Sequence, residues 1–121
     1  MMPLVKPLAA DSEFYIEEGC FVIELASAAE DPGLSIARCR VEPGKSTRWH
    51  RLHNTVERYV IQQGNGIVEV GDLTPQAVSD GDLVLIPAGC RQRITNAGES
   101  DLVFLALCTP RFLPACYEEC E

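Results

Sequence analysis

The sequence contains no long apolar run and no excess of basic residues, and each absence excludes a class of protein. Its purely apolar runs are only a few residues long, so we expect no segment that spans a bilayer. Ten Lys and Arg residues stand against 18 Asp and Glu residues, which gives a formal net charge of −8. Because nucleic acids and anionic membrane surfaces are bound mainly through cationic side chains, we expect neither as a partner.

The N-terminal segment also lacks the continuous apolar stretch of a signal peptide, because Pro3 and Pro7 interrupt it. The chain has six cysteines but no Cys-x2-Cys pair, so a structural zinc site of that type is not expected. These features predict a cytoplasmic protein with reduced thiols.

Helical periodicity is almost absent as well: only residues 26–30 and the C-terminal tail leave room for a helical turn. Short strand-like runs instead alternate with Gly, Pro, Asn and Asp, as in β-sandwiches and barrels. The expected strands cover residues 13–16, 20–25, 34–41, 46–52, 57–62, 66–70, 77–78, 83–86, 91–96 and 102–108. Gln63-Gly64-Asn65-Gly66 is the strongest hairpin signal. With so little helix the strands must cover one another, which predicts an all-β jelly roll or small closed barrel.

One histidine-containing segment carries candidate metal ligands. His50, His53 and Glu57 supply two imidazoles and a carboxylate, a plausible set of N and O ligands for Zn, Fe, Mn or Ni. Because strand side chains alternate between two faces, the spacing from His50 to His53 sends the two rings to opposite faces of a regular strand. Both rings reach one metal only if a bulge or turn intervenes at residues 51–53. Otherwise His53 lies on a loop in solvent.

A second segment, residues 81–96, contains a strand that stops at Pro87, turns, and resumes with Gln92 and Ile94 on one face. Together the two segments resemble the paired signature motifs of the cupin superfamily. The matching positions are Gly44, His50, Glu57 and Gly64 in residues 44–64, and Gly81, Pro87, Gly89 and Asn96 in residues 81–96. The sequence is most similar to small single-domain cupins of type 2, described as mannose-6-phosphate isomerase-like. The resemblance implies one small double-stranded β-helix (jelly-roll) barrel over residues 1–121, with a short C-terminal tail.

The chain departs from the family pattern at two ligand positions. Leu52 stands where the second His of the first motif belongs, with His53 displaced by one residue, and Gln92 replaces the His of the second motif. The resemblance therefore implies a divalent transition metal, Zn, Fe, Mn or Ni, held by His50 and Glu57 and completed by His53 or Gln92. A Gln oxygen is neutral and a poorer ligand than imidazole, so weak metal retention or a metal-free pocket is the alternative.

Two further residues are candidate substrate contacts. Tyr59 shares a strand face with Glu57. Arg40 alternates with apolar residues along its strand; if these pack outward, the guanidinium faces the barrel interior and binds a carboxylate or phosphate. If they face inward, Arg40 lies on a solvated strand face.

These residues support two classes of function. The first is a metal-dependent enzyme that acts on a small polar or anionic molecule, or a metal-free form of it in which His50 and Glu57 are an acid/base pair. The second is a non-catalytic binding or sensing module with a degenerate ligand set. Cupins host both roles, so no catalytic residue is assigned. The resemblance also implies a homodimer, with residues 13–25 as its candidate interface.

Overall fold

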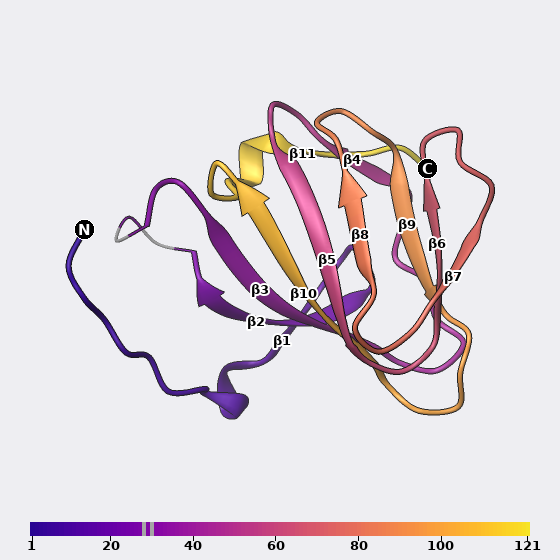
Figure 1. Ribbon diagram of the computed structural model, residues 1–121, viewed down its shortest axis with the longest axis horizontal. Helices are drawn as coiled ribbons and strands as arrows, with labels where there is room; N and C mark the ends of the chain where they lie inside the picture. Colours follow the sequence, from indigo (N-terminus) through magenta and orange to yellow (C-terminus); the bar gives the residue numbers. More distant parts are fainter. Residues whose placement is uncertain (28, 30) are drawn as a thin grey trace.

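The computed structural model describes residues 1–121 except residues 28 and 30. The described chain forms two antiparallel sheets, with strand orders β1-β2-β3-β10-β5-β8 and β11-β4-β9-β6-β7 (Figure 1). The strands are β1 (Phe14–Ile16), β2 (Cys20–Ala26), β3 (Ser35–Val41), β4 (His50–Leu52), β5 (Val56–Gln63), β6 (Gly66–Val70), β7 (Gln76–Val78), β8 (Leu83–Ile86), β9 (Gln92–Asn96), β10 (Leu102–Thr109) and β11 (Tyr117–Glu119). Two 3₁₀ turns, η1 (Ala10–Ser12) and η2 (Pro114–Cys116), are the described helical elements. The all-β prediction is confirmed, and none of the described helices has the length and apolarity needed to cross a membrane.

Three local expectations need correction. Residues 63–66 form a turn, but not a hairpin, because β5 and β6 belong to different sheets and the turn carries the chain between them. Gly64 is needed there, since its φ is +102° and a Cβ would lie 2.9 Å from the carbonyl oxygen of Asp101. The strand expected at residues 46–52 is shorter, with β4 preceded by an isolated bridge from Ser46 to Thr95. The C-terminal tail contains the expected helical turn, η2, but it also adds the edge strand β11 to the second sheet, and the turn expected at residues 26–30 lies partly outside the described residues.

The two sheets enclose a common core, and we call the space between them the lumen. Side chains such as Ile61 and Phe104 from one sheet and Ile94 from the other belong to the same buried cluster. Burial of each of these side chains contributes roughly 1.5–3 kcal/mol. The same alternation that buries Ile61 also buries Glu57 and Tyr59 on β5, and it buries Gln92 beside Ile94 on β9. Because burial of a polar group costs free energy unless the group is hydrogen-bonded, these inward polar residues indicate a functional site.

Asn96, the last residue of the second motif, has a structural role. Its amide nitrogen donates to the carbonyl oxygens of Val41 and Ser100, both at 2.8 Å, and its side-chain oxygen accepts from the Gly98 N–H at 2.9 Å. The side chain is 1% exposed. Asn96 therefore ties the end of β9 to β3 and to the loop before β10.

Candidate functional site

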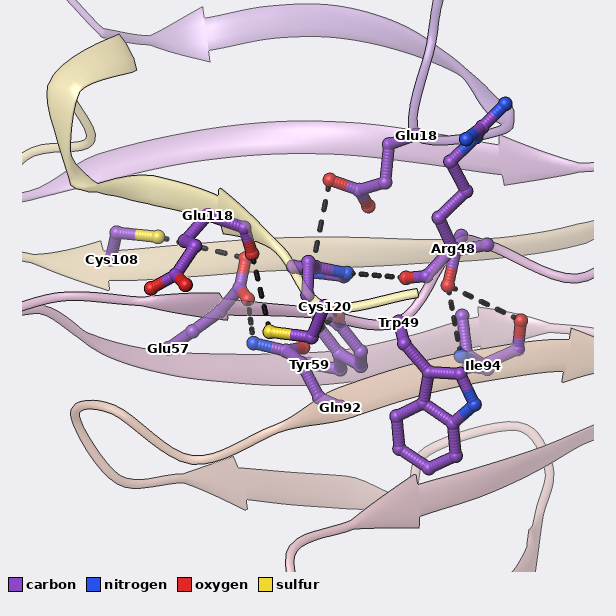
Figure 2. A network of polar contacts seen from close by, with 12 residues as sticks. Glu18, Arg48, Trp49, Glu57, Tyr59, Gln92, Ile94, Cys108, Glu118 and Cys120 are labelled. Atoms are coloured by element: carbon purple, nitrogen blue, oxygen red, sulfur yellow. Dashed lines mark hydrogen bonds and ion pairs between the residues drawn. The ribbon is translucent and has the colours of Figure 1, made fainter.

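The candidate site lies in the lumen, where polar side chains from several strands meet. His50 comes from β4, Glu57 and Tyr59 from β5, and Gln92 from β9, and all four are buried. Glu18, in the turn before β2, adds a second carboxyl (Figure 2). Strand alternation fixes the direction of the first four side chains, and the register that pairs His50 with Gln92 places β4 and β9 side by side.

A chain of hydrogen bonds fixes the Glu57 carboxyl. The Gln92 amide nitrogen donates to Glu57 Oε1 at 2.9 Å, and the Tyr59 hydroxyl donates to Gln92 Oε1 at 2.6 Å (Figure 2). The Cys108 thiol donates to Glu57 Oε2 at 3.7 Å. A thiol is a weak donor, so Oε2 is the less strongly held of the two carboxyl oxygens. Both ends of the Gln92 amide are engaged within the protein.

A backbone carbonyl group fixes the tautomer of the neutral His50 ring. Its Nδ1 lies 2.7 Å from the carbonyl oxygen of Arg48, which can only accept, so Nδ1 carries a proton. Nε2 is then the nitrogen that faces Glu18, at 3.7 Å from Oε1, the separation of an ion pair when the imidazole is protonated. The Tyr117 ring from β11 stacks on the imidazole, with centroids 5.3 Å apart. The C-terminal strand therefore covers His50.

The two lumen carboxyls titrate near neutral pH. Burial raises the pKa of Glu57 to about 7, with a further increase from the charge of Glu18, against the opposing effects of the Gln92 hydrogen bond, His50 and Cys108. Burial also raises the pKa of Glu18 to about 7. A carboxyl with a pKa near 7 can both give and take a proton at physiological pH.

A cavity of about 240 Å³ opens beside these carboxyls. Glu18, Glu57 and Tyr59 line it together with apolar side chains that include Phe104 and Phe112. Its volume is below the roughly 300–1,000 Å³ of pockets for drug-sized molecules, so it suits a smaller compound.

Two residues expected at the site lie elsewhere. His53 lies outside the lumen, with half of its side chain exposed and its Nε2 paired with Glu118 of β11. Strand β4 has no bulge and ends at Leu52, so His53 lies in the turn that follows the strand and not beside His50. Arg40 also faces outward, because Cys39 and Val41 on the same strand pack inward.

The outward Arg40 has protein partners of its own. Its guanidinium donates to Glu13 at 2.6 and 3.1 Å and to Asp101 at 3.3 Å, and it lies over the Phe21 ring. Those contacts do not leave it available to a molecule in the lumen.

The donor set does not fit a resident divalent metal. Among the described residues, no three His, Cys, Asp or Glu side chains are grouped so that they can hold a metal ion. Leu52, at the position of the family's second His, is 3% exposed and supplies no ligand atom. The Gln92 oxygen already accepts the Tyr59 hydroxyl, and its amide nitrogen is directed at Glu57. The metal ligands expected from the resemblance are therefore reduced to His50 and Glu57.

Comparison with known proteins shows the family. The family model for the Cupin domain matches residues 37–108, more than half of the chain. The chain is a cupin. The matched region contains His50, Glu57, Tyr59 and Gln92, but not Glu18 or Tyr117. No curated protein matches the sequence.

Solved structures share the cupin fold at low sequence identity. The plu4264 protein from Photorhabdus luminescens is 23% identical, with 89% of this cupin and 88% of that chain covered and a TM-score of 0.76. A double-stranded β-helix protein from Klebsiella pneumoniae is 13% identical over 98% and 99% of the two chains, with a TM-score of 0.79. Pac13, a nucleoside dehydratase, is 13% identical over 98% and 92%, with a TM-score of 0.78. At these identities the likeness shows the fold alone.

Sequence reasoning missed Glu18 and Tyr117. Glu18 precedes Gly19, whose φ is +109° and where a Cβ would lie 3.0 Å from the Ser46 carbonyl oxygen. The dipeptide Glu18-Gly19 signals a turn, but the sequence does not show that this turn lies over the lumen. Tyr117 reaches His50 only because β11 pairs with β4.

Proposed function

We propose that this cupin binds a small molecule in the lumen and that Glu57 exchanges a proton with it, without a resident metal. The observation that carries the proposal is a buried carboxyl that lines the cavity and has a pKa raised to about 7 by burial and by Glu18. Such a group is poised for general acid–base chemistry at neutral pH.

The replacement of the family's second-motif His by Gln92 supports this role. An imidazolium at that position would lower the pKa of Glu57 through its positive charge, whereas a neutral amide holds the carboxyl without adding a charge. Tyr59 fixes the amide in the orientation that donates to Glu57 Oε1. Glu57 Oε2, bonded only to the Cys108 thiol among the described residues, is the oxygen we assign to the ligand.

His50 and Glu18 form a second proton-holding pair beside Glu57. With Nδ1 bonded to the Arg48 carbonyl, His50 presents an unprotonated Nε2 toward Glu18 when the ring is neutral. A proton lost by one carboxyl can therefore be held at another group in the same lumen.

Covalent catalysis is not part of the proposal. A hydrogen bond with Cys20 and then burial raise the pKa of the Cys39 thiol, and burial raises the pKa of the Cys108 thiol and of the Tyr59 hydroxyl. These three groups line the cavity, and they stay protonated at neutral pH. Zn, Fe, Mn or Ni, the cofactors implied by the resemblance, are not part of it either, because the ligand set lacks two imidazoles.

The second candidate is a non-catalytic binding or sensing module. It is favoured by the finding that only His50 and Glu57 remain of the expected metal ligands. It shares the cavity but assigns no proton transfer to Glu57. The two candidates differ in outcome: Glu57→Gln abolishes turnover of a bound compound in the first, whereas in the second the bound compound is recovered unchanged from the wild type.

Ligand binding in the lumen is tested by a thermal-shift screen of small compounds on two variants. Ala106 is buried and lines the cavity, so Ala106→Leu fills part of it. Ala97 is exposed, so Ala97→Leu adds the same atoms outside the lumen. We expect compounds that raise the Tm of the wild type to act equally on Ala97→Leu and to lose their effect on Ala106→Leu. Equal effects on both variants would place the binding site elsewhere.

The homodimer and the cytoplasmic location stay predictions. Residues Phe14 and Tyr15 on the edge strand β1 are 45% and 60% exposed, which supports a contact between two copies through the first strands. Light scattering of the purified protein measures its mass and distinguishes a dimer from a monomer.

A further inference from the structure

The charged side chains that line the cavity are acidic. Three carboxyl residues line it, Glu18, Glu24 and Glu57, and its lining includes no Lys, Arg or His among the described residues. Glu57 is 8% exposed, so its charge is removed from solvent. A buried carboxylate without a cationic partner is costly, and a bound cation would offset that cost.

Arg111 donates to the Ser27 carbonyl oxygen at the cavity wall, at 2.9 Å, and other arginines are paired with carboxylates outside the cavity. Arg40 pairs with Glu13 and Asp101, and Arg93 pairs with Glu69. For Glu18 and Glu57, the described residues provide no ion pair with Lys or Arg; the described partner of Glu18 is the imidazole of His50, at 3.7 Å. When they are ionised, the lumen carboxyls thus carry negative charge that no Lys or Arg among the described residues balances by an ion pair.

The cavity wall also supplies aromatic faces. The rings of Phe14, Tyr59, Phe104 and Phe112 line it, and those of Tyr59 and Phe104 pack with centroids 4.4 Å apart. Aromatic faces attract cations through their quadrupole and accept apolar groups through burial. A carboxyl cluster within aromatic walls is complementary to a compound with a charged amine at one end and an apolar body.

From this complementarity we infer that the lumen of this cupin selects a small organic cation, an amine on an apolar body, over neutral and anionic compounds of the same shape. The inference rests on the proposed function, since it names the class of ligand for the same cavity. The sequence suggested a small polar or anionic ligand, and the inference departs from the anionic alternative because Arg40, the residue expected to bind an anion, faces outward and is paired with Glu13.

Calorimetric titration with three probes of nearly equal shape tests the inference. Benzylamine, benzyl alcohol and benzoate share one ring and differ in charge. We expect benzylamine to bind at least about tenfold more tightly than benzyl alcohol, and benzoate to bind most weakly, because its charge repels the lumen carboxyls. Tighter binding of the alcohol or of benzoate overturns the selectivity for cations and leaves the proposed lumen site standing. Absence of binding by all three overturns both.

Matched variants test whether the lumen carboxyls cause the selectivity for a cation. Glu57→Gln and Glu18→Gln each keep the side-chain shape and remove one carboxyl, so each should weaken benzylamine about tenfold and leave benzyl alcohol unchanged. Glu17→Gln removes an exposed carboxyl next to Glu18 and is the control, with no change expected for either probe. If Glu57→Gln does not fold, as judged by its circular dichroism melt, Glu18→Gln carries the test. An equal loss of amine affinity in Glu17→Gln would show that the net charge of the molecule, not the lumen, sets the preference.

Discussion

Gln92 donates its side-chain amide to Glu57 at 2.9 Å, from a position where the cupin pattern has a metal-binding His. The residue at this position therefore holds the Glu57 carboxyl by a hydrogen bond instead of binding a metal. Because the same amide accepts the Tyr59 hydroxyl at 2.6 Å, its orientation is fixed and its oxygen is not free for a metal. The substitution in the second motif thus accounts for the neutral partner of Glu57 and for one of the two imidazoles missing from the ligand set, and Leu52 in the first motif accounts for the other.

The Gln92→His substitution should reverse both effects. It would add an imidazole beside His50 and Glu57, so we expect the variant, purified without a metal-affinity step, to retain Zn²⁺ that the wild type does not retain. Elemental analysis by mass spectrometry measures this. Gln76→His places the same group on the exposed strand β7 and should leave the metal content unchanged. Near-stoichiometric metal in the wild type itself would contradict our interpretation of the donor set.

Stability should depend on pH through Glu57 in a defined direction. Its pKa is about 7 in the folded chain and 4.5 as the ordinary value, so between these pH values the folded state holds a proton that the unfolded state has lost. The free energy of unfolding contributed by Glu57 therefore falls as the pH rises from about 4.5 to about 7, by roughly 3 kcal/mol at about 1.4 kcal/mol per pKa unit.

The variant Glu57→Gln isolates this effect from other titrations. Urea unfolding at several pH values should show the variant gaining stability relative to the wild type as the pH rises through this window. The groups that face Glu57, namely Glu18, His50, Gln92 and Cys108, are the same in both proteins. A difference in stability that stays constant from pH 5 to 8 would contradict the raised pKa.

Loss of the Asn96 amide should destabilise the fold. Asn96→Ala would leave the carbonyl oxygens of Val41, which is buried, and of Ser100 without their 2.8 Å donor, at a cost of about 1–3 kcal/mol. Chemical denaturation measures the change, and Gln62→Ala, an exposed position on β5, is the control with an effect within about 0.5 kcal/mol. Equal effects of the two substitutions would remove the structural role that we assign to Asn96.

The Tyr117 ring should protect His50 from solvent. Tyr117→Ala removes the stacked ring at 5.3 Å, so we expect faster hydrogen–deuterium exchange of the β4 backbone amides. The change in exchange rate should be smaller in the other strands of the second sheet. Tyr15→Ala, on the exposed edge strand β1, should not alter exchange in β4. Unchanged exchange in the Tyr117 variant would show that β11 does not act as a cover.

The sequence could predict the fold class and the two motif segments because both depend on local rules. Turn residues and alternation mark the strands, and the motif spacing brings His50, Glu57 and Gln92 to inward positions. Alternation leaves two positions open for His53, the metal if a bulge intervenes or a loop in solvent, and the structure places it in a turn beside Glu118.

The remaining parts of the site depend on tertiary structure, and local rules do not determine them. Strand periodicity leaves open whether Arg40 or Cys39 faces inward, and only the packing of β3 against the core decides. Glu18 reaches the lumen because the turn before β2 lies against residues 46–47. The hairpin signal at residues 63–66 specifies a turn but not the sheet that receives the next strand.

The most direct test of the proposed function is the titration of the Glu57 carboxyl by NMR in protein labelled with carbon-13 at the glutamate side chains, with Glu57→Gln used to assign the signal. A midpoint near pH 7 for Glu57 is the result that burial and the Glu18 charge predict. A midpoint near 4.5, the ordinary value for Glu, would show that the carboxyl is solvated and that Glu57 is not the acid–base group that we propose.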